Sequence, residues 1–320
     1  WSSDVCSSDL GGTINLVNTE FKKFNIDFSY IDINDVDLLK STIKKNTRII
    51  YFETPTNPLL QIVDISLISS VALENDIISI IDNTFASPIN QNPINFGIDL
   101  VIHSATKYLG GHSDILAGSV SGAKEHIEKI KKSGINYGAN LSDYTVWLLE
   151  RSIKTLSVRV NAQNQNALDL AKFLDHNSLI KKVFYPGLEN HSSHEIASKQ
   201  MNGFGGMMSF EVTDKINSED FVSDLKIISP TMSLAGVESS ITSPSKTSHK
   251  KVDPQIRKKL GISDNLLRFS VGIEDIEDLM LDLDKSLKNV VFEEEMKASK
   301  FITPEIAFII CIKEIGRAHV

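Results

Sequence analysis

Three side chains suited to carbonyl chemistry recur at regular intervals in this sequence. Asn57, Asp82 and Lys107 each follow an apolar run, and 82 − 57 and 107 − 82 are both 25. A lysine that is desolvated at the end of a strand can lose its proton near neutral pH and form an imine with an aldehyde. Each residue also has an ordinary interpretation, as a solvated strand end, a helix N-cap or a turn residue. The shared spacing favours a joint chemical role.

The elements that must position these side chains alternate between residues 25 and 121. Residues 65–75 carry a helical pattern with one apolar face. Runs rich in β-branched residues predict strands at TRIIYFETPTN (47–57), DIISIIDNT (76–84), IDLVIHSATK (98–107) and LAGSVSGA (116–123). The unbroken apolar core of the second run indicates burial on both faces, as in a parallel sheet. This pattern predicts a doubly wound α/β layer, whose ligands bind at the carboxyl ends of the strands.

Pyridoxal phosphate is a cofactor that such a cluster could hold. Lys107 would form the Schiff base, and a buried carboxylate at Asp82 would keep the ring nitrogen protonated, as the electron-sink chemistry of the cofactor requires. Asn57 could donate to the phenolic oxygen of the cofactor. The hydroxyls of Ser104 and Thr106 lie close to Lys107 in the sequence and could hold the phosphate.

A second region follows a long helical pattern from Ser142 to about Leu174, whose apolar stripe includes Val146 and Ile153. It alternates helices with short strands, and its predicted elements are GGMMSFEV (205–212), LLRFSVGI (266–273) and a closing amphipathic helix (275–290). This pattern predicts a smaller α+β domain.

Arg268 stands out in the second region because its strand alternates apolar and polar residues. The planar guanidinium fork matches a carboxylate bidentately, so this residue could bind the carboxylate of an amino acid. The alternative is an exposed charge on an edge strand.

Composition excludes several other functions. A net charge of -8 argues against nucleic-acid and membrane partners. The only cysteines, Cys6 and Cys311, cannot form a disulfide framework or a metal cluster, so we expect a reducing, cytoplasmic location. There is no apolar segment of about 18 residues, and because no basic segment followed by an apolar run opens the sequence, we expect no signal peptide. The glycine clusters do not form a dinucleotide or P-loop fingerprint, and the histidines lack metal-ligand spacing.

The two ends of the chain differ from the rest. WSSDVCSSDL (1–10) and EIGRAHV at the carboxyl end resemble translated sequencing-adapter sequence, and we expect both to be foreign to the fold. The expected organisation is a foreign segment at 1–10, a large cofactor-binding domain at 11–150, a carboxyl-terminal substrate-binding domain at 151–293, and a tail at 294–320.

Longer motifs identify the chain as similar to the Cys/Met-metabolism pyridoxal-phosphate family, which includes the cystathionine γ-synthases, the cystathionine γ- and β-lyases and the methionine γ-lyases. The matching stretches are ETPTNP (53–58), IIDNTFASP (80–88), DLVIHSATKYLGGHSD (99–114), ERSIKTLSVR (150–159), VFYPGL (183–188), GFGGMMSFEV (203–212), SLAGVESSIT (233–242) and LLRFSVGIED (266–275). The resemblance implies the fold of type I pyridoxal-phosphate transferases, with a mostly parallel sheet and a smaller α+β domain. It also implies a homotetramer (a dimer of dimers) acting on sulfur amino acids.

The same resemblance supplies roles for individual residues. Lys107 would be the Schiff-base lysine, Asp82 the partner of the ring nitrogen, and Asn57 the neighbour of the phenolic oxygen. Arg268 would bind the substrate α-carboxylate, with Ser233 assisting it. Glu238 resembles an acidic residue of the cystathionine γ-synthases and γ-lyases, and favours that type over the alternatives of a methionine γ-lyase or cystathionine β-lyase.

The sequence departs from the family at its amino-terminal end. Leu10 occupies the position of a tyrosine that stacks on the cofactor, and a phosphate-cradling turn and a Tyr and Arg that reach the neighbouring subunit are not found. We therefore expect about a quarter of the family's chain to be missing. Two rival hypotheses are an inactive, truncated relative that only binds partners and a nicotinamide-linked dehydrogenase, although the latter lacks its glycine fingerprint.

Overall fold

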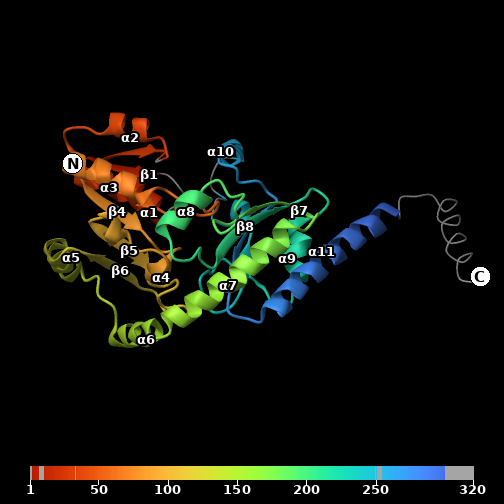
Figure 1. Ribbon diagram of the computed structural model, residues 1–320. Coiled ribbons are helices and arrows are strands. Elements are labelled where there is room, and N and C mark those ends of the chain that lie inside the picture. Colours follow the sequence, from red (N-terminus) through yellow and green to blue (C-terminus); the bar gives the residue numbers. More distant parts are fainter. Residues whose placement is uncertain (1, 7–10, 33, 249, 251–253, 300–320) are drawn as a thin grey trace, which may run out of the picture.

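Two β-sheets with flanking helices make up the computed structural model, which describes residues 2–6, 11–32, 34–248, 250 and 254–299 (Figure 1). The strands are β1 (Ser2–Cys6), β2 (Asp27–Ile31), β3 (Thr47–Glu53), β4 (Ile78–Asp82), β5 (Leu100–Ser104), β6 (Gly118–Gly122), β7 (Ile180–Phe184), β8 (Met207–Val212), β9 (Ser229–Pro230), β10 (Ser240–Thr242) and β11 (Leu266–Ser270). The α-helices are α1 (Gly11–Glu20), α2 (Val36–Thr42), α3 (Ile65–Glu74), α4 (Ser87–Asn90), α5 (Lys124–Tyr137), α6 (Asp143–Ile153), α7 (Leu156–Asp175), α8 (His194–Gln200), α9 (Ser218–Asp224), α10 (Pro254–Lys259) and α11 (Ile276–Ser299).

The first sheet has the strand order β2-β1-β3-β4-β5-β6. The first five of these strands run parallel, and β6 pairs with β5 in the antiparallel direction. A parallel pair needs a long crossover connection, usually a helix, whereas the chain between β5 and β6 forms turns. The expected α/β layer with a mostly parallel sheet is therefore present, with one antiparallel edge strand.

The two faces of this sheet are covered unequally. Helix α3 packs on one face, where Ile65, Ile68 and Val71 join Ile50 and Ile81 in a buried cluster, as the helical pattern predicts. On the opposite face the burial of β4 is only partial, at Ile78, Ile80 and Asp82. The expectation that both faces of β4 are buried is therefore wrong for one face, because the described elements seal only the face under α3.

Strand β1 lies in the interior of the first sheet, between β2 and β3, although the sequence pattern predicts that residues 1–10 lie outside the fold. A strand in this position is held by main-chain hydrogen bonds, which almost any residue type can provide. Side-chain periodicity therefore need not reveal it. The foreign origin of residues 1–10 stays a prediction, and Leu10 lies outside the described residues.

The second sheet has the order β7-β8-β11-β10-β9 and is antiparallel except for the pair β9 and β10. The pattern that predicts one helix over 142–174 is in fact two helices, α6 and α7, which separate at Lys154 and Thr155. The Thr155 hydroxyl donates to Ser152 O at 3.1 Å and accepts from Arg159 Nε at 3.1 Å. Such side-chain bonds compete with helical main-chain bonds and explain the interruption.

The main core lies between α7, the second sheet and α11. Leu279, Leu283 and Leu287 of α11 are fully buried, which confirms the inward face predicted for the closing helix. This helix continues to Ser299, beyond the predicted end at residue 290. Val146 and Ile153 of α6 are 50% and 46% exposed, so the predicted apolar stripe is not buried along its whole length. The domain boundary at residue 150 stays a prediction.

Within the described ranges, none of the helices combines the length and the apolar character that crossing a membrane requires.

Candidate active site

Lys107 lies in a turn directly after β5, residues 105–111, which we call the Lys107 turn. Its main-chain N–H donates to Ser104 O at 3.0 Å, and Gly111 N–H donates to Lys107 O at 2.7 Å, which fixes the turn at the carboxyl end of the strand. Burial lowers the pKa of the Lys107 ammonium, and the positive charge of Arg268 lowers it further. Both effects favour the neutral amine, which is the form that attacks an aldehyde.

Asp82 is the last residue of β4, the strand next to β5. Thr84 N–H donates to its Oδ1 atom at 2.9 Å, and the Tyr51 hydroxyl also hydrogen-bonds this carboxylate. Burial raises the pKa of Asp82, while the bonds from Thr84 and Tyr51 oppose that rise. The sheet therefore presents a partly desolvated carboxyl group. Burial favours its protonated form, and the hydrogen bonds from Thr84 and Tyr51 favour its ionised form.

Hydroxyl groups gather around the same strand ends. Thr84 Oγ1 accepts from Ser104 N–H at 2.8 Å, which joins the turns after β4 and β5. Thr106 Oγ1 accepts from Ala117 N–H at 3.0 Å and donates to Ala117 O over a longer 3.3 Å. Ser104 ends β5 just before the Lys107 turn, and the Thr106 hydroxyl closes that turn onto the residues before β6. That these two hydroxyls hold a phosphate stays a prediction.

Arg268 lies in the middle of β11, a central strand paired with β8 and β10. It is 6% exposed, so the alternative of an exposed edge-strand charge is wrong. Its guanidinium donates to Met232 O at 2.9 Å and to Asn57 Oδ1 at 3.4 Å. The second contact spans the two sheets and brings Asn57 to the same place as Arg268.

The equal spacing of Asn57, Asp82 and Lys107 does not correspond to equal positions on their strands. Asp82 ends β4, whereas Asn57 lies four residues after the end of β3 (57 − 53) and Lys107 three residues after the end of β5 (107 − 104). Cis peptide bonds precede Pro55 and Pro58 in the segment that carries Asn57. These turns, rather than strand register, bring the side chains toward the same edge.

Ser233 and Glu238 lie in a loop, residues 233–238, that packs on the continuation of the Lys107 turn. Val237 N–H donates to Gly111 O at 2.9 Å. The Ser113 hydroxyl donates to Glu238 Oε1 at 2.8 Å and lies 3.2 Å from Ser233 Oγ. Both predicted substrate-binding residues are therefore attached to the segment that begins with Lys107.

Sequence reasoning missed two residues of this constellation. Tyr51 precedes Glu53 by one side-chain period of β3, and Glu53 pairs with Asp82, so strand alternation alone could have placed Tyr51 on the same face. Ser113 has no comparable signal, because its partners lie 120 and 125 residues away in the chain.

The chemistry of this set fits pyridoxal phosphate, which carries an aldehyde, a basic ring nitrogen and a phosphate. A half-buried amine with a lowered pKa suits the aldehyde, and a carboxylate on the neighbouring strand suits the ring nitrogen. The hydroxyls of Ser104 and Thr106 and the main-chain donors of the turns suit the phosphate. Arg268 suits the carboxylate of an amino acid.

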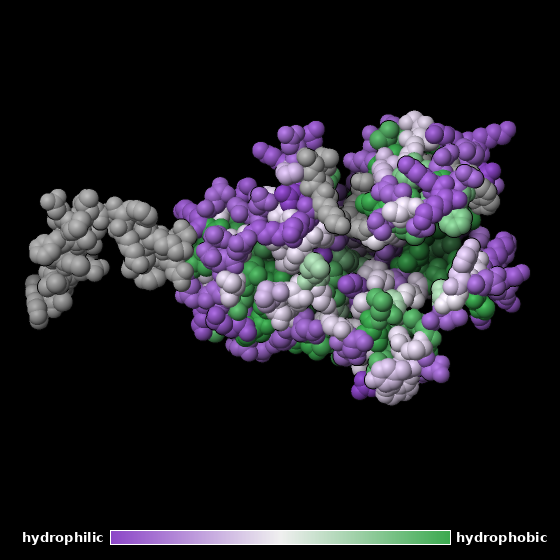
Figure 2. Space-filling model, turned by 180° about the vertical axis from the view of Figure 1, so that it is seen from behind, coloured by the Kyte–Doolittle hydropathy of each residue, from purple (hydrophilic) through white to green (hydrophobic). Residues whose placement is uncertain are grey.

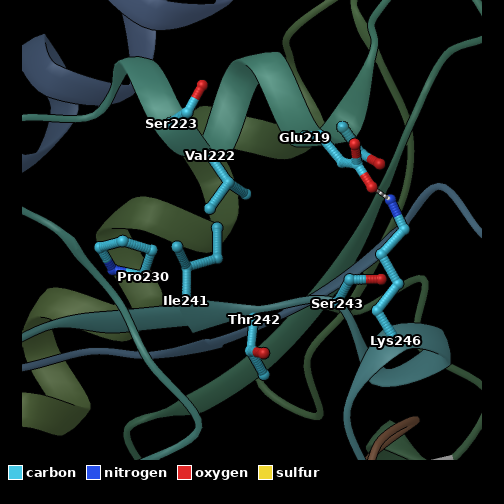
Figure 3. A pocket seen from close by; sticks show the side chains of 9 residues that line it. Glu219, Val222, Ser223, Pro230, Ile241, Thr242, Ser243 and Lys246 are labelled. Carbon is cyan, nitrogen blue, oxygen red and sulfur yellow. Dashed lines mark hydrogen bonds and ion pairs between the residues drawn. The ribbon is translucent and has the colours of Figure 1, made fainter. Parts of the chain in front are cut away.

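Other features of the surface do not involve these residues. A shallow pocket lies between α9 and the β9–β10 edge; it is lined by Val222, Pro230 and Ile241, with an ion pair between Glu219 and Lys246 at its rim (Figure 3). None of the predicted site residues lines it. In the part of the chain that the structure describes, no cluster of His, Cys, Asp or Glu is suited to a metal ion.

Comparisons with known proteins agree with this chemistry. The family model for the Cys/Met metabolism PLP-dependent enzymes matches residues 3–288. The chain is 46% identical over 279 residues to the cystathionine beta-lyase of Lactococcus lactis subsp. cremoris (strain MG1363), covering 87% of this chain and 73% of that protein. It is 41% identical to the cystathionine gamma-lyase of Bacillus subtilis (strain 168), covering 88% and 74%. The crystal structure of cystathionine gamma-lyase from Lactobacillus plantarum complexed with L-serine superposes with a TM-score of 0.87 at 40% identity, covering 90% of this chain and 76% of that chain.

Proposed function

Because the chain belongs to the Cys/Met metabolism family of pyridoxal-phosphate-dependent enzymes, we propose that it performs γ-elimination or γ-replacement on substrates of the cystathionine or O-acyl-homoserine type. The observation that carries this proposal is the convergence of Lys107, Asn57 and Arg268. The electrostatic contact between Lys107 and Arg268 and the Arg268–Asn57 hydrogen bond link all three.

When bound, pyridoxal phosphate supplies an electron sink for the negative charge that develops at the substrate Cα. Lys107 is the proposed covalent attachment point and, once released, the base that removes the Cα proton with its neutral amine. Asp82 would hold a proton on the ring nitrogen of the cofactor through its carboxylate. Arg268 binds the substrate α-carboxylate, which orients the Cα–H bond toward Lys107.

The 233–238 loop supports the γ-type assignment. Glu238 is exposed and is held by the Ser113 hydroxyl at 2.8 Å, next to Ser233. In this position its carboxylate could bind the distal amine of cystathionine, and Ser233 could assist Arg268. Once Lys107 has delivered the Cα proton to the cofactor, its neutral amine would remove a proton from the β-carbon, so that the γ-substituent leaves.

Cystathionine β-elimination is the second candidate, favoured by the 46% identity to a protein named cystathionine beta-lyase. The two reactions release different keto acids from the same substrate. Elimination at the γ-carbon gives cysteine, ammonia and 2-oxobutyrate, whereas elimination at the β-carbon gives homocysteine, ammonia and pyruvate.

The test is an assay of the purified protein with added pyridoxal phosphate. Cystathionine, methionine, and O-acyl-homoserine with cysteine are offered separately, and the keto acid or thioether formed is identified by mass spectrometry. We expect 2-oxobutyrate from cystathionine or cystathionine from the acylated substrate. Pyruvate would replace the γ-type assignment with the β-lyase, and no product from any substrate would reject the proposal.

We also propose that the protein assembles as a homotetramer, a dimer of dimers. Helix α6 carries four large apolar side chains that are at least 46% exposed: Tyr144, Val146, Trp147 and Ile153. Figure 2 shows that hydrophobic surface is exposed in several places on one side of the molecule. Such patches favour association with another chain. Sedimentation velocity of the wild-type protein and of Trp147→Glu tests this, and a wild-type monomer at micromolar concentration would contradict it.

A further inference from the structure

Helix α7 carries a row of polar side chains that donate hydrogen bonds to main-chain carbonyls of neighbouring segments. Arg159, Gln163 and Asn166 lie on one helical face, because their spacing is i, i+4 and i+7. Figure 1 shows α7 running from the side of the first sheet along the second. This course allows one rigid helix to contact segments that carry site residues from both sheets.

Arg159 holds the turn that carries Lys107. Its guanidinium donates to Tyr108 O at 2.9 Å and Leu109 O at 3.5 Å, the carbonyls that follow Lys107 directly, and to Ser152 O at 3.0 Å. It is 5% exposed, and burial lowers its pKa. No carboxylate among the described residues forms an ion pair with it, so its buried charge is stabilised by neutral carbonyls. Such a charge is tolerated only where these bonds are kept.

Gln163 holds the 233–238 loop in the same way. Its Nε2 atom donates to Gly236 O at 2.7 Å and to Val271 O at 3.1 Å. Gly236 belongs to the 233–238 loop, and Val271 directly follows the strand of Arg268. The side chain is 1% exposed, and its Oε1 atom has no hydrogen-bond partner in the described part of the chain. Rotating the amide would set Oε1 against two carbonyl oxygens, so the two donated bonds fix its orientation.

The two held segments also bond to each other. Val237 N–H donates to Gly111 O at 2.9 Å, and Ile273 N–H donates to Val237 O at 2.9 Å. The Lys107 turn, the 233–238 loop and the end of β11 therefore form one hydrogen-bonded unit on α7. A shift of the loop relative to Lys107 would have to break the bonds of Arg159 or of Gln163.

We infer that Arg159 and Gln163 are positioning residues, which fix the Lys107 turn relative to the loop of Ser233 and Glu238. This inference rests on the proposed function, because it assigns a task to residues whose partners are proposed to bind cofactor and substrate. It predicts that Gln163 affects substrate binding and that Arg159 affects the chemical step, although neither touches the reacting atoms.

The first test measures hydrogen exchange in the cofactor-free protein. Gln163→Leu removes both donors while keeping a side chain of similar size. Gln165→Leu makes the same change at an exposed position of α7, where only a bond to Asp169 is lost. We expect exchange in residues 233–239 to become at least about tenfold faster in Gln163→Leu, and to stay unchanged in Gln165→Leu and in β3 and β4 of both variants. Equal exchange in the two variants would overturn the inference.

The second test separates KM from kcat. We expect Gln163→Leu to raise KM for cystathionine about tenfold at full cofactor content, because the loop that contacts substrate is released. We expect Arg159→Lys, which keeps the charge but not the fork, to lower kcat about tenfold, while Arg151→Lys at an exposed position of α6 stays within about twofold. Kinetic constants of Gln163→Leu and Arg159→Lys equal to wild type would overturn the inference.

A milder variant covers the case in which Gln163→Leu does not fold. Gln163→Asn keeps the amide but shortens its reach by one methylene, and we expect an intermediate increase in loop exchange. No increase in exchange would overturn the inference. A wild-type protein that acts on no sulfur amino acid, but whose variants still show the exchange changes, would reject the proposed function and leave the positioning role standing.

Discussion

The two sheets hold their site groups in different ways. In the first, mostly parallel sheet, Asp82 ends a strand and Lys107 lies in a turn beyond one, so both project at an edge. In the antiparallel sheet, Arg268 lies in the middle of β11 with paired strands on both sides. An edge leaves room for a ligand, whereas a charge inside a sheet must be satisfied by the protein around it.

This difference has a consequence for rigidity. The position of Arg268 is fixed by sheet register and by the Met232 carbonyl. Lys107 depends on a few turn hydrogen bonds and on the Arg159 bonds beneath them. We therefore expect Lys107, the proposed catalytic group, to be the more easily displaced, and Arg268, the proposed substrate-binding group, to be the more firmly held. The following predictions test this contrast, beginning with the largest effect.

Replacing Lys107 should cost more activity than any change in the second sheet. We expect Lys107→Ala to lower kcat for cystathionine by at least about 10³-fold, because the proposed covalent attachment point and the proposed base would be lost together. Borohydride reduction followed by peptide mass spectrometry should find the cofactor on Lys107 in wild type and not in the variant. Lys124→Ala, at an exposed position of α5, should be unaffected. Full activity in Lys107→Ala would contradict the proposed role of Lys107 in the reaction.

Replacing Arg268 in the second sheet should change both KM and the pKa of Lys107 beside the first sheet. We expect Arg268→Gln to raise KM about 100-fold, because the proposed bidentate contact with the substrate carboxylate would be lost. The positive charge of Arg268 is also one cause of the lowered Lys107 pKa, so its removal should move that pKa upward. The neutral amine of the released Lys107 is then lost at a higher pH, and the acidic limb of kcat, which reports the substrate complex, moves to higher pH.

Arg268→Lys serves as the matched variant, since it keeps the charge without the fork. Its KM should rise as well, but the acidic limb should stay in place. Identical pH profiles for Arg268→Gln and wild type would show that the two regions are not electrostatically coupled.

A side chain at Gly111 should strain the Lys107 turn. This residue has a φ of +69°, and a Cβ atom there would overlap the Arg159 guanidinium. We expect Gly111→Ala to lower the free energy of unfolding by about 2 kcal/mol, measured by urea denaturation. Gly118→Ala in β6, where the nearest heavy atom to an added Cβ is 4.0 Å away, is the control and should differ little from wild type.

The smallest expected effect is on the free energy of unfolding, which the ionised, buried Asp82 carboxylate lowers. Burial raises its pKa in the folded chain above that of the unfolded chain, so ionisation of Asp82 destabilises the fold. We expect Asp82→Asn to stabilise the cofactor-free protein near neutral pH, since the amide still accepts from Thr84. The gain should shrink as pH falls through the folded pKa and vanish below the unfolded one. Thermal unfolding from pH 3 to 8 checks this, and a constant difference would contradict it.

The local sequence pattern predicts much of the first sheet and less of the region that contains the second sheet. Periodicity located β3, β4, β5 and α3, because apolar side chains repeat along each element with its own period. It missed β1, whose place in the sheet depends on main-chain pairing. It also missed the break between α6 and α7, which depends on the Thr155 hydroxyl.

The sequence by itself determined the family of chemistry, because Asp82 and Lys107 each follow an apolar run that forms a strand, and the carboxyl ends of parallel strands lie at one edge of a sheet. Only the tertiary structure decided that Arg268 is buried in a central strand and that Ser113 joins Ser233 to Glu238. It also decided that Arg159 of α7 donates to the Tyr108 and Leu109 carbonyls that follow Lys107. These contacts join residues more than 50 positions apart. Local periodicity records which face of an element is apolar, whereas the partner of a polar side chain depends on how distant elements pack.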